Sequence, residues 1–128
     1  MALALETVGW PEASFFGRGD DLSAAGSGAD AVIIATPDDA IREVAAALPH
    51  GDAVVLHLAG SRGLSELGDH PRVGALHPLV SLPDPETGAA RLRGAWFATA
   101  GDPLVTRIVA ALKGRSFDVA DEDRASYH

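Results

Sequence analysis

Two polar residues, Ser61 and His77, follow apolar runs at positions where α/β proteins commonly build their active sites. Pro78 disfavours a helical conformation at His77 and so holds the imidazole at the end of an extended segment. An imidazole held there suits a general acid, and packing beneath the loop 81–88 is the alternative interpretation. Ser61 could serve the same site or could cap a short helix at Leu64–Leu67, and both readings stay open.

His57 lies inside the near-continuous apolar run 53–59, which is typical of a strand that is covered on both faces. A histidine in such a strand is more often a neutral, hydrogen-bonded core residue than a catalytic one. We therefore predict a structural role for His57.

The segment 29–48 predicts a buried strand, a sharp turn and a helix. The run 31–35 is apolar without alternation, and Thr36-Pro37 ends it because proline lacks the N–H that a strand ladder needs. Asp38 or Asp39 can then cap a helix. Helical spacing places four apolar residues on one face of that helix, namely Ile41, Val44, Ala45 and Leu48.

Ligands of open parallel sheets bind at the carboxyl ends of the strands. The turn after the run 31–35 is therefore the first place to expect a cofactor. The residues expected to contact it are Ala35, Thr36, Pro37 and Asp38.

Further strands are predicted at 13–16, 53–59, 73–80, 95–100 and 117–119, and a helix is predicted after Asp102-Pro103. Strands without alternation, separated by helical segments, indicate an α/β fold. We predict a mostly parallel, Rossmann-like sheet with helices on both faces, formed by one domain over residues 1–128.

Arg18 follows the predicted strand 13–16 and would face the adenosine ribose in a dinucleotide fold. An arginine there pairs with a 2′-phosphate, which favours NADP, and the alternative is that Arg18 is a solvated loop charge. Asp20 or Asp21 could instead accept from ribose hydroxyls, so NAD stays open.

The 128 residues carry 10 Lys and Arg against 18 Asp and Glu, a formal charge of −8 that argues against a nucleic-acid footprint. The absence of cysteine excludes disulfides, thiolate metal sites and a cysteine nucleophile, and no metal site is expected. No apolar run approaches the ~18 residues of a membrane span. We expect a cytoplasmic protein with no membrane partner.

Several blocks of the sequence resemble a Rossmann-like family of unknown function that is related to prephenate dehydrogenase, pyrroline-5-carboxylate reductase and deazaflavin-dependent NADP reductase. These blocks are DAVIIATPDDAI, the strand ending in LAGS, ALHPL with the following DPE loop, LRGAWFATAGDP and the closing DEDRASYH. The resemblance covers nearly the whole sequence, and its most specific parts are His77-Pro78, the block 92–102 and Tyr127-His128.

Members of that family open with a strand and a G-x-G-x-x-G turn, and they continue after the terminal Tyr-His into a long helical domain. This sequence shows neither, so the resemblance implies an N-terminally incomplete Rossmann-like domain. Loss of that strand would leave a gap of roughly 10 Å between Phe15–Phe16 and Ala31–Ala35. A truncated copy is favoured over a rearranged sheet or pairing with a second chain. Without the Gly-rich turn, cofactor affinity should be much reduced.

The resemblance implies an NAD(P)-dependent oxidoreductase that acts on an unknown small molecule. Thr36, Pro37 and Asp38 would border the cofactor, Ile41 would pack beneath it, and Arg18 would face its adenosine end.

By the same resemblance, His77 would be the acid or base near the nicotinamide and Ser61 its hydrogen-bonding neighbour. The truncated chain itself is expected to be inactive. The alternatives are a non-catalytic nucleotide-binding or regulatory module, and a structural fragment that is completed by strand pairing in a homodimer or larger oligomer.

Overall fold

A five-stranded sheet forms the centre of the chain in the computed structural model, which describes residues 16–17, 19–79, 90–120 and 123. The strands lie in chain order, β1 (Ala31–Ile34), β2 (Val54–His57), β3 (Val73–Pro78), β4 (Trp96–Gly101) and β5 (Arg115–Asp118). β1, β2 and β3 are parallel, β4 runs antiparallel to β3, and β5 is parallel to β4. The predicted mostly parallel α/β sheet is therefore confirmed.

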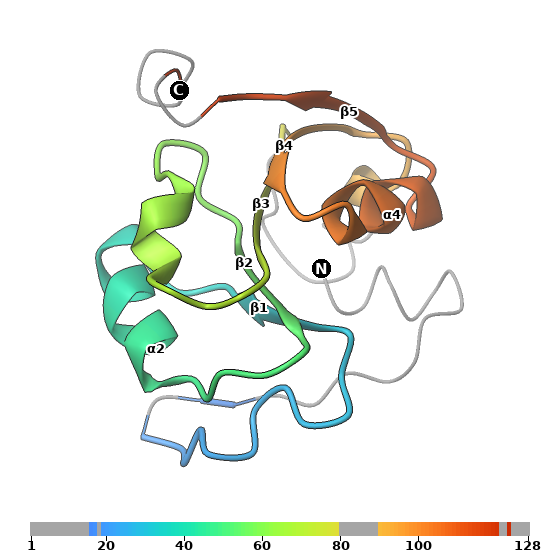
Figure 1. Cartoon of the computed structure of the whole chain (residues 1–128). Helices are drawn as coiled ribbons and strands as arrows, with labels where there is room; N and C mark the ends of the chain where they lie inside the picture. The colour runs from blue at the N-terminus through green and yellow to red at the C-terminus, as the bar shows by residue number, and fades with distance from the viewer. Residues whose placement is uncertain (1–15, 18, 80–89, 121–122, 124–128) are drawn as a thin grey trace.

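Helices cover both faces of this sheet, α2 (Ile41–Ala47) on one side and α4 (Leu104–Ala111) on the other (Figure 1). Two short 3₁₀ segments, η1 (Asp38–Ala40) and η2 (Leu64–Leu67), precede α2 and follow β2. None of the described helices is long and apolar enough to cross a bilayer.

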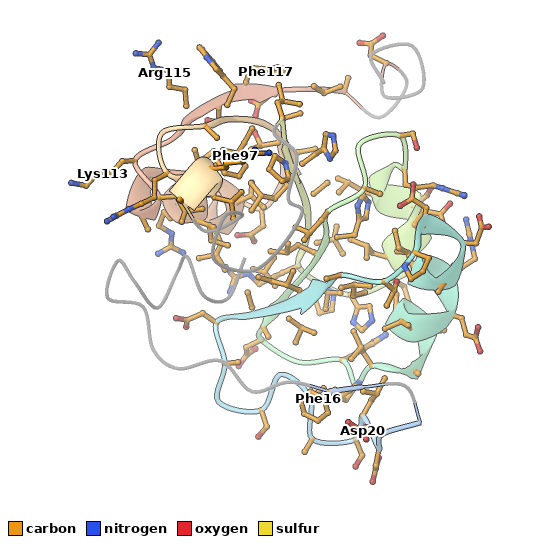
Figure 2. The ribbon with its side chains drawn as sticks, turned by 180° about the vertical axis from the view of Figure 1, so that it is seen from behind. Phe16, Asp20, Phe97, Lys113, Arg115 and Phe117 are labelled. Carbon is orange, nitrogen blue, oxygen red and sulfur yellow. The ribbon has the colours of Figure 1, made fainter. Side chains whose placement is uncertain are left out.

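Two apolar cores fill the space between the sheet and the helices on its two faces. The core beneath α4 joins Leu56 and Leu76 of the sheet to Ile108 of the helix, and Phe97 lies within it (Figure 2). The core beneath α2 joins Ile34 and Val55 to the helix. The core buries Ile41 and Ala45 of α2 and Leu48 directly after the helix, and Val44 is partly buried, so the predicted apolar face is confirmed.

The predicted helix caps are wrong. Neither Asp38 nor Asp39 caps a helix with its side chain, because both lie within η1, which begins after Pro37. Ser61 does not cap η2 either, since the residue that precedes this segment is Gly63 and no side chain caps it.

The Asp102 carboxylate links the first turn of α4 to the residues that precede β2 and β3. Its Oδ1 accepts the Leu104 N–H at 2.9 Å, and its two oxygens accept from Arg72 Nε and Nη2 at 2.9 and 3.2 Å. Arg72 also donates to the Asp52 carbonyl at 3.0 Å, ahead of β2. The Arg72 hydrogen bonds hold the pKa of Asp102 below its usual value.

Several sequence predictions concern residues beyond those described. They are Arg18, the strand 13–16 apart from Phe16, the loop 80–89, and the closing block except Asp123.

Candidate functional site

The carboxyl ends of β1, β2 and β3 meet at one edge of the sheet. Ile34 is in register with His57, and His57 with Ala75, so His77 extends two residues beyond that level. The turn 35–38 and the loop 58–63 leave the sheet at the same edge. The structure thus brings the predicted cofactor turn 35–38, the loop 58–63 that carries Ser61 (the Ser61 loop) and His77 together at the carboxyl ends of the parallel strands.

The turn 35–38 leaves three residues open to solvent, since Ala35, Pro37 and Asp38 are exposed. Thr36 is half-buried, and its Oγ1 donates to the Pro37 carbonyl at 3.2 Å. Ile41 is 1% exposed and packs in the core beneath α2, so it supports the turn and presents little surface to a ligand.

His57 is fully buried and holds both ends of the Ser61 loop. Its Nε2–H donates to the Gly63 carbonyl at 3.0 Å, and its Nδ1 accepts from the Ala59 N–H at 3.1 Å. One ring nitrogen faces a carbonyl and the other faces an N–H, so these bonds fit only the neutral Nε2–H tautomer. The prediction of a neutral, hydrogen-bonded core histidine is confirmed.

His77 is half-buried, and its ring is fixed by the backbone of the same loop. Nδ1 lies 3.0 Å from the Leu58 carbonyl, which can only accept, so Nδ1 carries the proton and Nε2 carries the lone pair of the neutral ring. Ser61 is also half-buried, three residues beyond Leu58. His57 and Leu58 therefore couple the loop that carries Ser61 to the ring of His77.

An ion pair that the sequence did not indicate joins the loop 58–63 to η1. Arg62 Nη2 lies 2.7 Å from Asp39 Oδ1, and Arg62 Nη1 lies 3.8 Å from Glu66. Arg42 of α2 also reaches Glu66, at 3.3 Å. The only sequence signal was the Arg62 to Glu66 spacing of four, which is typical of helical pairs and did not point to Asp39.

The acidic residues considered for ribose binding stabilise their own turn. Asp20 Oδ2 accepts from the Gly17 N–H at 2.6 Å, and Asp20 is exposed (Figure 2). Asp21 Oδ1 accepts from the Ser23 N–H at 2.9 Å, and this bond lowers the pKa of Asp21 below its usual value. Both carboxylates thus bind backbone N–H groups.

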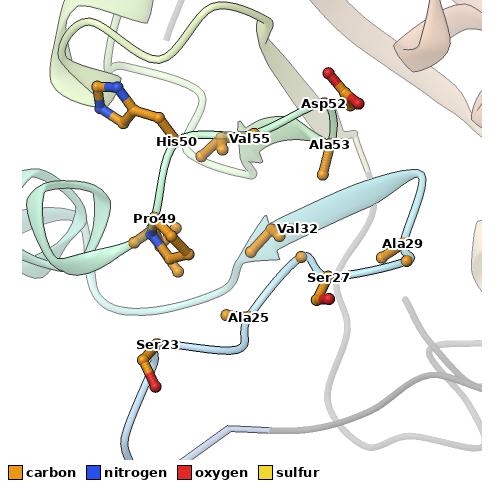
Figure 3. A pocket seen from close by; sticks show the side chains of 14 residues that line it. Ser23, Ala25, Ser27, Ala29, Val32, Pro49, His50, Asp52, Ala53 and Val55 are labelled. Atoms are coloured by element: carbon orange, nitrogen blue, oxygen red, sulfur yellow. The ribbon is translucent and has the colours of Figure 1, made fainter.

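A groove of about 390 Å³ lies at the amino ends of β1 and β2, opposite the carboxyl ends described above. Its walls are the segment 23–29 and the segment 48–53, with Val32 and Val55 between them (Figure 3). None of the predicted site residues that the structure describes lines this groove. Among the described residues, no three His, Asp or Glu side chains are grouped to hold a metal ion.

The mostly parallel five-stranded sheet and the helices on both of its faces form a Rossmann-like fold. No protein-family model and no curated protein sequence matches the chain. Solved structures do match it, and they are Rossmann-like proteins that include oxidoreductases.

Three of these structures show how far the similarity to this chain extends. A candidate NADP oxidoreductase, BF3122 from Bacteroides fragilis, has a TM-score of 0.76 at 20% identity, over 99% of this chain and 57% of its own. Prephenate dehydrogenase from Aquifex aeolicus has a TM-score of 0.72 at 16% identity, over 94% and 57%. Protein TM1727 from Thermotoga maritima has a TM-score of 0.62 at 26% identity, over 77% and 40%.

The chain therefore spans between 40% and 57% of the length of these three structures. A second structure of the Aquifex enzyme is a complex with hydroxyphenyl propionate and NAD+. The shared fold confirms the predicted resemblance to this group of Rossmann-like proteins.

Proposed function

We propose that this chain is the nucleotide-binding part of an NAD(P)-dependent oxidoreductase. The observation that supports this most directly is the convergence of the turn 35–38, the loop 58–63 and His77 at the carboxyl edge of the parallel strands. Structural neighbours include an NADP oxidoreductase candidate and a dehydrogenase solved with NAD+. A cytoplasmic location fits this role.

The described residues fit the nicotinamide end of such a cofactor better than its pyrophosphate. The strand-to-helix turn after β1 reads Ala-Thr-Pro-Asp, and no described strand is followed by a Gly-rich turn that opens a helix. Thr36, Pro37 and Asp38 would border the cofactor, with Ile41 supporting them from beneath. Arg18 would select NADP over NAD at the adenosine end.

His77 and Ser61 would carry out the proton transfer that accompanies hydride transfer in this oxidoreductase. A bound nicotinamide would supply or accept a hydride, and an alcohol or carbonyl group of the substrate must then lose or gain a proton. The bond from Nδ1–H to Leu58 directs the proton exchange to Nε2 of His77. Ser61, on the loop that His57 holds, would orient the same oxygen. The substrate is a small molecule whose identity is open.

Calorimetric titration of the chain with NADPH and NADH tests the binding step. Because no described strand leads into a Gly-rich turn that could hold the pyrophosphate, we expect weak binding, with a Kd of about 0.1–1 mM, and a preference for NADPH. Ala35→Trp should block the exposed turn and weaken binding at least ~10-fold, a loss of about 1.4 kcal/mol. Ala46→Trp, on an exposed position of α2, is the matched control and should bind like the parent chain.

A non-catalytic nucleotide-binding or regulatory module is the second candidate, and it is favoured because no described strand leads into a Gly-rich turn. This module would bind NADPH in the same titration, but it would not oxidise NADPH with any carbonyl substrate. If neither nucleotide binds, or if Ala35→Trp and Ala46→Trp bind equally well, the dinucleotide proposal fails.

A further inference from the structure

The Ser61 loop is fixed to the strands beside it. The ring of His57 binds both ends of the loop, and the Leu58 carbonyl lies 3.0 Å from Nδ1 of His77. These bonds attach the loop to β2 and β3, on one side of the candidate site. The spacing between Ser61 and the turn 35–38 therefore depends on contacts that cross from one segment to the other.

The side chain of Arg62 makes such a contact. Arg62 directly follows Ser61, and its Nη2 donates to Oδ1 of Asp39 at 2.7 Å. Asp39 lies in η1 and directly follows Asp38, the last residue of the turn 35–38. A charge-assisted hydrogen bond therefore joins the residue next to Ser61 to the residue next to the cofactor turn.

Glu66 contacts the other terminal nitrogen of the same guanidinium. Its side chain is 15% exposed, and its Oε1 lies 3.8 Å from Nη1 of Arg62 and 3.3 Å from Nη2 of Arg42. Arg42 belongs to α2, and η2, which carries Glu66, packs beside this helix (Figure 1). The guanidinium of Arg62 is thus attached to η2 through one nitrogen and to η1 through the other.

We propose that Arg62 is a positioning residue that sets the distance between the cofactor turn 35–38 and Ser61. This inference rests on the proposed function, since that distance matters only if a nicotinamide binds at both segments. The bond to Asp39 holds the turn, and the peptide bond to Ser61 carries the constraint to the hydroxyl group that would orient the substrate oxygen. A displacement of about 1 Å between reacting groups can lower a rate ~100-fold, so such a constraint has a function.

The ion pair between Arg62 and Asp39 should add little to the stability of the fold. The Asp39 side chain is 96% exposed, and water screens an ion pair in such a position. Loss of the pair should therefore leave the Tm within about 2 °C of the parent chain. A positioning role would instead appear in nucleotide binding and in the local order of the Ser61 loop, so the two roles can be measured separately.

Removal of the Asp39 carboxylate has opposite effects under positioning and under simple electrostatics. NADPH is an anion, so charge alone predicts tighter binding when a nearby negative charge is lost. Positioning predicts that Asp39→Ala weakens NADPH binding at least ~3-fold in calorimetry. Glu43→Ala is the matched control, because Glu43 is exposed in the first turn of α2, and it should bind no more weakly than the parent. Unchanged or tighter binding by Asp39→Ala would overturn the proposal.

Variants of Arg62 test the same bond from its other side. Arg62→Gln should weaken NADPH binding about as much as Asp39→Ala, and the double variant should bind no more weakly than Arg62→Gln, because one shared bond is lost. Arg62→Lys keeps a cation that can pair with Asp39 and should bind within ~2-fold of the parent. Arg42→Gln removes the other cation at Glu66 and should bind like the parent. Equal losses in Arg62→Gln and Arg42→Gln would contradict the proposal.

Amide hydrogen exchange without nucleotide separates a failure of this inference from a failure of the proposed function. In Asp39→Ala, the amides of residues 58–63 should exchange at least ~5-fold faster than in the parent chain, while those of β3 keep their rates. If the parent chain binds no NADPH, the proposed function fails, and the exchange rates still decide whether the ion pair holds the loop. Equal exchange rates in Asp39→Ala and the parent chain would overturn the positioning role in either case.

Discussion

His57 and His77 occupy neighbouring strands at one edge of the sheet and play different parts there. The ring of His57 is buried, and both of its nitrogens bind the backbone of the Ser61 loop. The ring of His77 is half-buried, and its Nδ1 lies 3.0 Å from the Leu58 carbonyl of that loop. Burial and backbone bonds therefore make His57 the support, and they make His77 the better candidate for proton transfer.

We predict that His57→Phe destabilises the fold. The variant removes the ring nitrogens that bind the buried Ala59 N–H and the half-buried Gly63 carbonyl, which costs about 1–3 kcal/mol in free energy of unfolding. Urea denaturation measures this loss. His50→Gln serves as the control because His50 is exposed, and its effect should stay within about 0.5 kcal/mol. Equal effects of the two variants would contradict the supporting role of His57.

His77 itself should be replaceable without loss of the fold. His77→Gln keeps a polar side chain that can donate to Leu58, so the unfolding free energy should change by less than about 1 kcal/mol. NADPH binding should change less than ~3-fold, since the proposed role concerns proton transfer and not affinity. A large loss of binding, measured by calorimetry, would instead make His77 a cofactor-binding residue.

At the scale of the elements, Asp102 connects α4 to the strands through Arg72. The Arg72 hydrogen bonds lower the pKa of Asp102 in the folded chain. A lowered pKa stabilises the fold above the ordinary carboxyl range, and this contribution is lost as the pH falls through the folded-state pKa, below about 4.

Asp102→Asn keeps an oxygen for the Leu104 N–H but removes the charge that Arg72 binds. We expect its Tm to fall by about 2–5 °C at pH 7, and this difference from the parent chain should shrink below about pH 4. Thermal unfolding between pH 3 and 7 gives the comparison. A difference that is constant with pH would show that the ion pair does not contribute.

Gly101, at the end of β4, allows a close approach that no other residue type permits. Its φ is +87°, and an added Cβ would overlap the Val73 carbonyl of β3. Gly101→Ala should therefore cost at least ~2 kcal/mol in free energy of unfolding. Gly51→Ala, where no atom lies within 4 Å of the added Cβ, should be neutral or slightly stabilising. Equal stabilities of the two variants would contradict this packing.

The strands could be predicted because continuous apolar runs such as 53–59 and 73–80 identify buried strands. The direction of the strands could not be predicted, since the same apolar run fits a parallel or an antiparallel ladder. The reversal of direction at β4 is therefore seen only in the structure. The Arg62 to Asp39 and Arg72 to Asp102 pairs join residues 23 and 30 positions apart, so local spacing gave no sign of them. The caps failed because η1 moved the start of α2 beyond Asp38.

At the scale of the whole molecule, the chain shares its fold with about half of several longer Rossmann-like proteins. The carboxyl edge of the sheet gathers the predicted site residues that the structure describes outside the core, namely the turn 35–38, Ser61 and His77. This arrangement supports the proposal of a nucleotide at the carboxyl edge.

Binding of a nicotinamide dinucleotide at the carboxyl edge can be tested by titrating the ¹⁵N-labelled chain with NADPH and following its amide chemical shifts. We predict shifts concentrated in residues 35–38 and 58–63 and at His77, with little change along 23–29 and 48–53. Shifts confined to the groove between those last two segments, or no shifts at millimolar NADPH, would contradict it.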